Sequence, residues 1–144
     1  MKILVDGDAC SVKKIIITVA RKYDIEVLIF ASINHSINTE NYAKVIYVDD
    51  YSQAVDIKIA NMLDKGDIVV TNDYGLASLV VSNKSYCISN RGQIFTNENI
   101  NRFLLNRHIT MDAKKRGHRI KGPRKRHMED DKKFRSGLIK LIEK

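Results

Sequence analysis

The sequence predicts a three-layer α/β fold with a largely parallel central sheet. Short runs rich in β-branched residues recur along the chain, separated by longer segments in which apolar residues return at helical spacing. This alternation is typical of strands joined by crossover helices, which cover both faces of the sheet. A chain of 144 residues can build one core of its own, so we expect a single domain over residues 1–144.

The first 63 residues are expected to form three strands and two helices. Mostly apolar runs predict strands at 2–5, 26–31 and 44–48. A helix is expected over 11–23, with Ser11 as its N-cap and an inward stripe of Val12, Ile15, Ile16 and Val19. A polar loop at 32–41 separates the second strand from the third. Ser52 is expected to cap the second helix, which runs to about Leu63 and turns Val55, Ile59 and Met62 inward.

The remaining residues continue this pattern and then become basic. Further strands are expected at 67–71 and 86–88, with a small hairpin strand at 94–95. A short helix is predicted over 74–82, and a longer helix opens at Asn97 and continues toward Lys115. Two glycines and the only proline interrupt the helical pattern at 116–127, which predicts a loop there. An amphipathic helix over 129–143 closes the chain, with Phe134, Leu138, Leu141 and Ile142 expected to face inward.

Carboxylates stand at the ends of two expected strands. Asp6 ends the first strand, Asp8 follows two residues later, and Asp73 follows the strand at 67–71. The carboxyl ends of parallel strands open into one crevice, so these side chains converge if the two strands are neighbours. Clustered carboxylates repel one another unless protons or a cation hold them, which predicts a Mg²⁺ or Mn²⁺ site. Structural roles compete with ligation, because Asp8 and Asp73 suit helix N-caps, and Asp56 suits the first turn of a helix.

The net charge of +8 is concentrated at the C-terminal end. Residues 1–100 carry 10 Lys/Arg and 12 Asp/Glu, a balance of −2, whereas residues 101–144 carry 15 and 5, a balance of +10. Residues 114–127 contain no acidic residue and predict a nucleic-acid-binding set: Lys114, Lys115, Arg116, Arg119, Lys121, Arg124, Lys125 and Arg126. The competing interpretation is a solvated segment that only keeps the protein in solution. With no Trp and few aromatic residues, base stacking is not an obvious strategy for this chain.

The remaining composition favours a cytoplasmic protein without a membrane partner. Asp6 interrupts the N-terminal apolar run too early for a secretory signal, and no apolar run reaches the length of a bilayer span. Cys10 and Cys87 have no zinc-type spacing, so we expect free thiols.

Several motifs together resemble the UPF0178, or DUF188, family of uncharacterised bacterial proteins (the YaiI/YqxD type). The opening Val5-Asp6-Gly7-Asp8-Ala9-Cys10-Ser11-Val12-Lys13 resembles that family's first motif, with Ser11 in place of a proline. Further matches follow in order along nearly the whole chain, at residues 54–56, 66–73, 76–77, 90–92, 96–100, 122–123, 130 and 134. Gly75 replaces a second proline, a change that affects turn stiffness more than chemistry.

That family is similar to the PIN-like nuclease superfamily, and the resemblance implies a PIN-like domain with a metal-dependent nuclease activity. It implies that Asp6, Asp56 and Asp73 are catalytic and bind Mg²⁺ or Mn²⁺, with Asp8 as a further metal ligand. A metal-activated water would attack a phosphodiester, and RNA is preferred over DNA as the substrate by analogy alone.

Two other functions remain open. A non-catalytic RNA- or ribosome-associated binding protein would work through the basic loop and keep the carboxylates as helix caps. A haloacid-dehalogenase-like phosphatase would use Asp6 as a covalent nucleophile in the Asp6-Gly7-Asp8 motif. The phosphatase fits less well, because it needs an acidic pair at a later strand end and residues 84–96 contain no acid.

Overall fold

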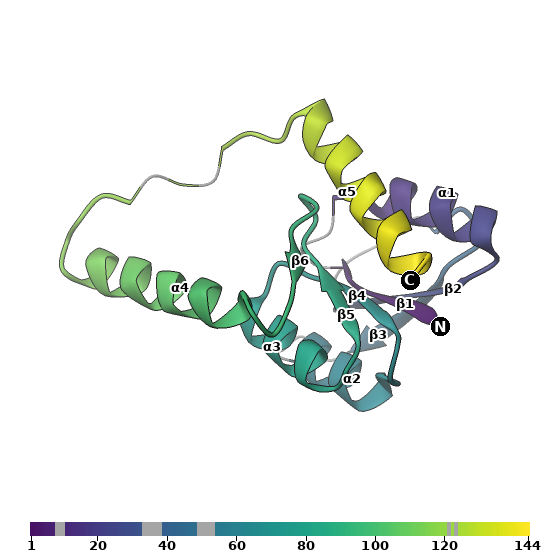
Figure 1. Ribbon diagram of the computed structural model, residues 1–144, viewed down its shortest axis with the longest axis horizontal. Helices are drawn as coiled ribbons and strands as arrows, with labels where there is room; N and C mark the ends of the chain where they lie inside the picture. The colour runs from purple at the N-terminus through teal and green to yellow at the C-terminus, as the bar shows by residue number, and fades with distance from the viewer. Residues whose placement is uncertain (8–10, 33–38, 49–53, 121, 123) are drawn as a thin grey trace.

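The computed structural model has a six-stranded sheet between two layers of helices, as the sequence predicts (Figure 1). It describes residues 1–7, 11–32, 39–48, 54–120, 122 and 124–144. The sheet order is β3-β2-β1-β4-β5-β6. The strands are β1 (Lys2–Asp6), β2 (Glu26–Ser32), β3 (Lys44–Val48), β4 (Ile68–Val70), β5 (Tyr86–Ile88) and β6 (Ile94–Phe95). The first five are parallel to their neighbours, and β6 pairs antiparallel with β5 as the expected hairpin.

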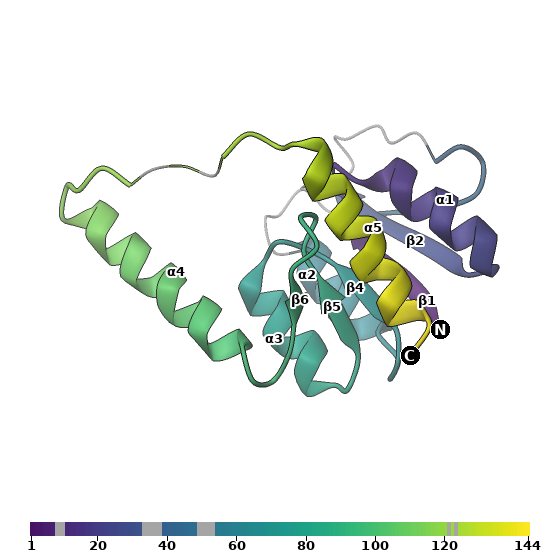
Figure 2. The same ribbon diagram turned by 45° about the horizontal axis from the view of Figure 1, so that its top comes forward.

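Successive strand residues supply two separate hydrophobic cores, because side chains alternate between the faces of a sheet. Ile3 and Val5 of β1 belong to the core under α1 (Lys13–Tyr23) and α5 (Met128–Ile142). Leu4 between them belongs to the core under α2 (Ala54–Met62) and α3 (Tyr74–Ser82). Figure 2 shows the two pairs of helices on opposite sides of the sheet. Strands buried on both faces explain why their sequences are continuous apolar runs.

The strand order reverses between β1 and β4, and this position determines where a site can form. From β1 the chain moves outward through β2 and β3, and then returns through α2 to β4 on the other side of β1. Val5 pairs with Val70 in the parallel register, so the ends of both strands lie at the same edge. The predicted proximity of these two strands is confirmed. Open α/β sheets bind ligands at such reversals.

Helix α4 (Ile100–Lys115) leaves the body of the protein after its first turns (Figures 1 and 2). Phe103 and Leu104 near its beginning are half-buried against the core under α3, whereas Leu105 and Ile109 are exposed. Outside residues 121 and 123, the stretch 116–127 has no helix or strand, and it returns to the start of α5. Within the described parts of the chain, no helix has both the length and the apolar character to cross a membrane.

Two expected helix starts are wrong, and hydrogen bonds explain both. α1 begins at Lys13 with Val12 as its N-cap, while Ser11 instead accepts a bond from Asn90 Nδ2 at 3.3 Å. α4 begins at Ile100 rather than Asn97, because Thr96 and Asn99 exchange side-chain bonds with each other's backbone N–H at 2.8 and 3.2 Å. The expected cap at Ser52 lies outside the described residues.

Candidate active site

Thr71 connects the ends of β1 and β4. Its Oγ1 donates to Asp6 Oδ2 at 3.1 Å and accepts from the backbone N–H of Asp73 at 3.0 Å. Thr71 is buried, so these bonds are protected from water. Thr71 therefore fixes the position of Asp6 relative to Asp73 at the ends of the two strands.

Asp73 caps helix α3 and also faces the acidic cluster. Its Oδ1 accepts from the backbone N–H groups of Gly75 and Leu76, at 2.8 and 3.2 Å. The capping role that competed with ligation in the sequence is thus real for Asp73. The two roles are compatible, because an N-cap uses few of the lone pairs that a carboxylate offers.

Asp56, in the first turn of α2, hydrogen-bonds to Asp73. Burial raises the pKa of Asp56 to about 7, together with this hydrogen bond and the negative charges of Asp73 and Asp6. Burial also acts to raise the pKa of Asp73, but the bonds from Asp56, Leu76 and Gly75, with Arg107 nearby, hold it below its ordinary value. The geometry therefore brings Asp6, Asp56 and Asp73 together, and the raised pKa of Asp56 lets it keep its proton to a far higher pH than an ordinary carboxyl group does.

The acidic pair opens to the surface. Asp56, Asp73 and Arg107 line a cavity of about 530 Å³, and Leu76 and Leu79 also belong to its lining. Arg107 Nη1 lies 3.9 Å from Asp73 Oδ1. The sequence reasoning missed Arg107, although it stands four residues after Phe103 and three after Leu104. That spacing placed it on the α4 face that turns toward α3.

The donor chemistry of this cluster fits Mg²⁺ or Mn²⁺, which favour carboxylate oxygens. When a cation binds between two hydrogen-bonded carboxyl groups, it can displace the proton that lies between them. Among the described residues, however, no group of three or more His, Cys, Asp or Glu side chains forms a metal-binding arrangement. Asp8, the fourth expected ligand, lies outside the described residues. What the described chain provides is the Asp56–Asp73 pair with Asp6 beside it.

The predicted nucleic-acid-binding residues fall into two groups. Lys114, Lys115, Arg116 and Arg119 are exposed at and just beyond the end of α4, and Arg116 pairs with Asp112 at 3.3 Å. Lys125 is exposed as well, and Lys121 lies outside the described residues. Arg124 and Arg126 form the second group and bind acidic residues of α5.

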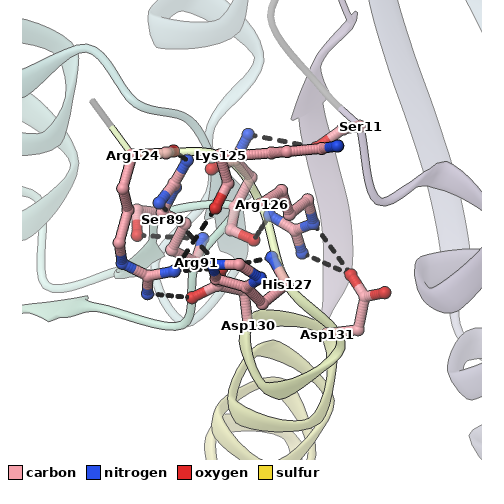
Figure 3. Close-up of polar contacts among 10 residues, drawn as sticks. Ser11, Ser89, Arg91, Arg124, Lys125, Arg126, His127, Asp130 and Asp131 are labelled. Atoms are coloured by element: carbon pink, nitrogen blue, oxygen red, sulfur yellow. Dashed lines mark hydrogen bonds and ion pairs between the residues drawn. The ribbon is translucent and has the colours of Figure 1, made fainter. Parts of the chain in front are cut away.

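Asp130 is the centre of that second group (Figure 3). Arg124 binds it with two parallel bonds, Nη1 to Oδ2 at 2.9 Å and Nη2 to Oδ1 at 2.6 Å. The backbone N–H of His127 donates to Asp130 Oδ2 at 2.9 Å. Arg124 and this N–H together lower the pKa of Asp130 to about 2. A buried carboxylate thus fixes the end of the basic segment to the first turn of α5.

Two further arginines attach this segment to the turn between β5 and β6. Arg91 donates to the carbonyl oxygen of Arg124, as Figure 3 shows. Arg126 donates to Asp131 Oδ1 at 2.8 Å and to the carbonyl oxygen of Asn90 at 2.6 Å. Arg124 and Arg126 therefore have structural partners that the sequence reasoning did not assign, whereas residues 114–119 do not share in this network.

Comparisons with known proteins agree along the whole chain. The model of the uncharacterised YaiI/YqxD family, DUF188, matches residues 4–144. A "UPF0178 protein" of Clostridium kluyveri is 44% identical over 142 residues, which cover 99% of this chain and 93% of the relative. One from Clostridium perfringens is 42% identical over 144 residues (100% and 96%), and one from Natranaerobius thermophilus is 44% identical over 142 (99% and 96%). No solved structure matches the chain.

Proposed function

We propose that this chain, which belongs to the uncharacterised YaiI/YqxD (UPF0178) family, is a metal-dependent nuclease of the PIN-like type that acts on RNA. The observation that carries the proposal is the convergence of Asp6, Asp56 and Asp73 where the strand order reverses. Carboxylates forced to share a proton in an open cavity are typical of functional sites. A purely structural cap would require only Asp73.

Asp6, Asp56 and Asp73, with Asp8, would hold Mg²⁺ or Mn²⁺. The bound cation would make a water more acidic and neutralise the charge that develops on the phosphate. Thr71 fixes the position of Asp6 through its hydroxyl. Arg107 faces the same cavity and would bind a phosphate oxygen, because a guanidinium matches phosphate geometry.

One helix connects this cavity to the basic residues. Arg107 and Lys115 both lie on α4, about 12 Å apart along its axis at the usual rise per residue. A polyanion that contacts Lys114, Lys115 and Arg119 can therefore extend back along α4 to the carboxylates. Such contacts bind phosphates without reading sequence.

A non-catalytic RNA- or ribosome-associated binding protein is the second candidate. It is favoured by the capping bonds of Asp73, which give that carboxylate a structural reason to be present. In this alternative the basic segment would carry the function.

The two candidates are separated by cleavage assays with Asp6→Asn and Asp73→Asn. Asn caps helices as well as Asp does, so Asp73→Asn removes a charge and keeps α3 intact. Labelled single-stranded RNA and DNA are incubated with Mn²⁺, with Mg²⁺ or with chelator. Asp24→Asn, an exposed change at the end of α1, serves as the matched control.

We expect cleavage of RNA that needs the metal, disappears in both site variants while RNA binding persists, and remains in Asp24→Asn. Tight RNA binding without metal-dependent cleavage by the unchanged protein would contradict the nuclease and establish the binding protein.

A further inference from the structure

Three aromatic side chains from different elements meet beside the carboxylates. Tyr74 directly follows Asp73, Phe95 ends β6, and Phe103 lies in α4. The ring centroids are 5.7 Å apart for Tyr74 and Phe95, 5.5 Å for Tyr74 and Phe103, and 5.2 Å for Phe95 and Phe103. Phe95 is buried, whereas Tyr74 and Phe103 are partly exposed. The few aromatic residues of the chain thus include a compact group at this edge.

These rings line a cavity of about 390 Å³ together with Asn72, Gln93 and Arg91. Pockets for small molecules commonly measure roughly 300–1,000 Å³. Asn72 and Tyr74 also line a smaller cavity that contains Asp73 and Arg107. The aromatic cavity therefore adjoins the place where the proposed function puts a phosphate.

Two of the amides that line this cavity, Asn72 and Gln93, have fixed orientations. Asn72 Oδ1 accepts from the backbone N–H of Asn90 at 3.0 Å, which leaves its Nδ2 as a donor. Gln93 Nε2 donates to the carbonyl oxygen of Ile94 at 3.0 Å, which leaves its Oε1 as an acceptor. Within the described parts of the chain, neither Asn72 Nδ2 nor Gln93 Oε1 forms a hydrogen bond. Asn72 thus offers the cavity a donor and Gln93 an acceptor, beside an aromatic surface.

We propose that this cavity is a nucleobase subsite, which holds the base of the nucleotide next to the phosphate that Arg107 would bind in the adjoining cavity. The base would stack on Tyr74 or Phe103 and bond to Asn72 and Gln93 through its edge, as unpaired bases do on RNA-binding proteins. The location of the phosphate rests on the proposed function. A base can enter only when it is unpaired, so the substrate is single-stranded at this position.

Binding of the four ribonucleoside 5′-monophosphates, measured in chelator by titration calorimetry, tests the subsite without any catalysis. Ribose 5-phosphate carries the same phosphate and lacks the base, and we expect it to bind at least about 10-fold more weakly, as for loss of one base stack. Tyr74→Leu and Phe103→Leu should each weaken monophosphate binding by about 10-fold. Tyr86→Leu replaces a partly buried aromatic at the other end of β5 and should change nothing.

Gln93→Met keeps the size of the side chain and removes the acceptor, so it should alter the relative affinities of the four monophosphates even if an aromatic variant fails to fold. Equal binding of ribose 5-phosphate and the monophosphates would overturn the subsite, whether or not the protein cleaves RNA. Base-dependent binding that Tyr74→Leu weakens, in a protein without metal-dependent cleavage, would support the subsite and contradict the nuclease.

Discussion

Thr71 shows how much of the site depends on one hydroxyl group. Its Oγ1 bonds both to the Asp6 carboxylate and to the backbone N–H of Asp73. Thr71→Val has nearly the same shape and leaves both partners without this bond, so we expect it to reduce the free energy of unfolding by about 1–3 kcal/mol. Urea denaturation of the metal-free protein measures this loss.

Thr71→Ser is the matched control, because it keeps the hydroxyl and removes only a methyl group. We expect it to retain most of the stability that Thr71→Val loses. Equal losses in the two variants would mean that packing of the methyl group, rather than the two hydrogen bonds, stabilises this position.

Sequence reasoning at the level of single residues was accurate where it depended on strand ends. Asp6 and Asp73 could be chosen because each follows an apolar run. Their proximity could be predicted because the carboxyl ends of neighbouring parallel strands lie together. Arg107 and Thr71, whose hydroxyl links the two aspartates, could not be chosen in this way. Their roles depend on how α4 packs against α3 and on hydrogen-bond directions, neither of which is local in sequence.

Among the secondary-structure elements, α5 depends on the absence of a side chain at Gly92. This glycine has φ +86°, and a Cβ added there would lie 2.7 Å from the backbone carbon of Lys133 in α5. We expect Gly92→Ala to destabilise the protein by roughly 2–4 kcal/mol, since backbone strain and overpacking add. Thermal and urea unfolding measure the change.

Gly117→Ala provides the comparison, because Gly117 has φ +85° and nothing within 4 Å of an added Cβ. It carries the same backbone strain without the clash, so we expect a smaller loss of about 1 kcal/mol. If Gly92→Ala were no worse than Gly117→Ala, close contact between α5 and the β5–β6 turn would not contribute to stability.

The bond between Asp130 and Arg124 makes the attachment of α5 sensitive to acid. The pKa of Asp130 is about 2 in the folded protein and 3.8 ordinarily, so between these values the unfolded chain binds more protons. The stabilisation is complete above about pH 5 and is lost as the pH falls from 4 toward 2. Asp130→Asn should therefore lower the melting temperature by several degrees at pH 7 and by roughly half as much at pH 3.

Glu129→Gln, one residue away in the same helical turn and exposed, is the control for removing a negative charge near the start of α5. We expect it to leave the pH dependence of the melting temperature unchanged. A difference between Asp130→Asn and the unchanged protein that is constant from pH 7 to pH 3 would contradict the role of this ion pair.

The sequence predicted the positions of the helices and strands closely, but it did not predict the side-chain contacts between them. Periodicity predicted α5 with Phe134 and Leu138 inward, and both are buried. It could not predict that Asp130, on an otherwise charged helix face, would be only 3% exposed and bound by Arg124. From sequence alone, an acidic residue in the first turn of a helix is expected to face solvent. The periodicity of α5 gives no information about Arg124, which binds Asp130 from a segment without helix or strand.

At the scale of the whole molecule, the acidic residues lie at the carboxyl ends of β1 and β4, and α4 extends from beside them toward the exposed basic residues. The predicted three-layer fold is confirmed, and it explains why residues as distant in sequence as Asp6 and Asp73 lie together. Of the predicted nucleic-acid-binding residues, Lys114 and Lys115 lie beyond Arg107 on the same helix, and Arg116 and Arg119 follow just after its end. Metal binding, RNA binding and catalysis stay predictions that the fold makes physically coherent.

The contribution of the basic residues to RNA binding is measurable as a salt dependence. For single strands, the slope of log K against log salt changes by about 0.7 for each phosphate contact. The double variant Lys114→Gln with Lys115→Gln should therefore bind RNA more weakly and show a slope shallower by about 1.4. Lys65→Gln with Lys84→Gln removes the same charge from exposed positions before β4 and β5, at the opposite edge of the sheet. This control should keep the original slope. Equal changes in both double variants would mean that net charge, rather than contacts along α4, attracts the RNA, and the path from the basic segment to the carboxylates would have to be abandoned.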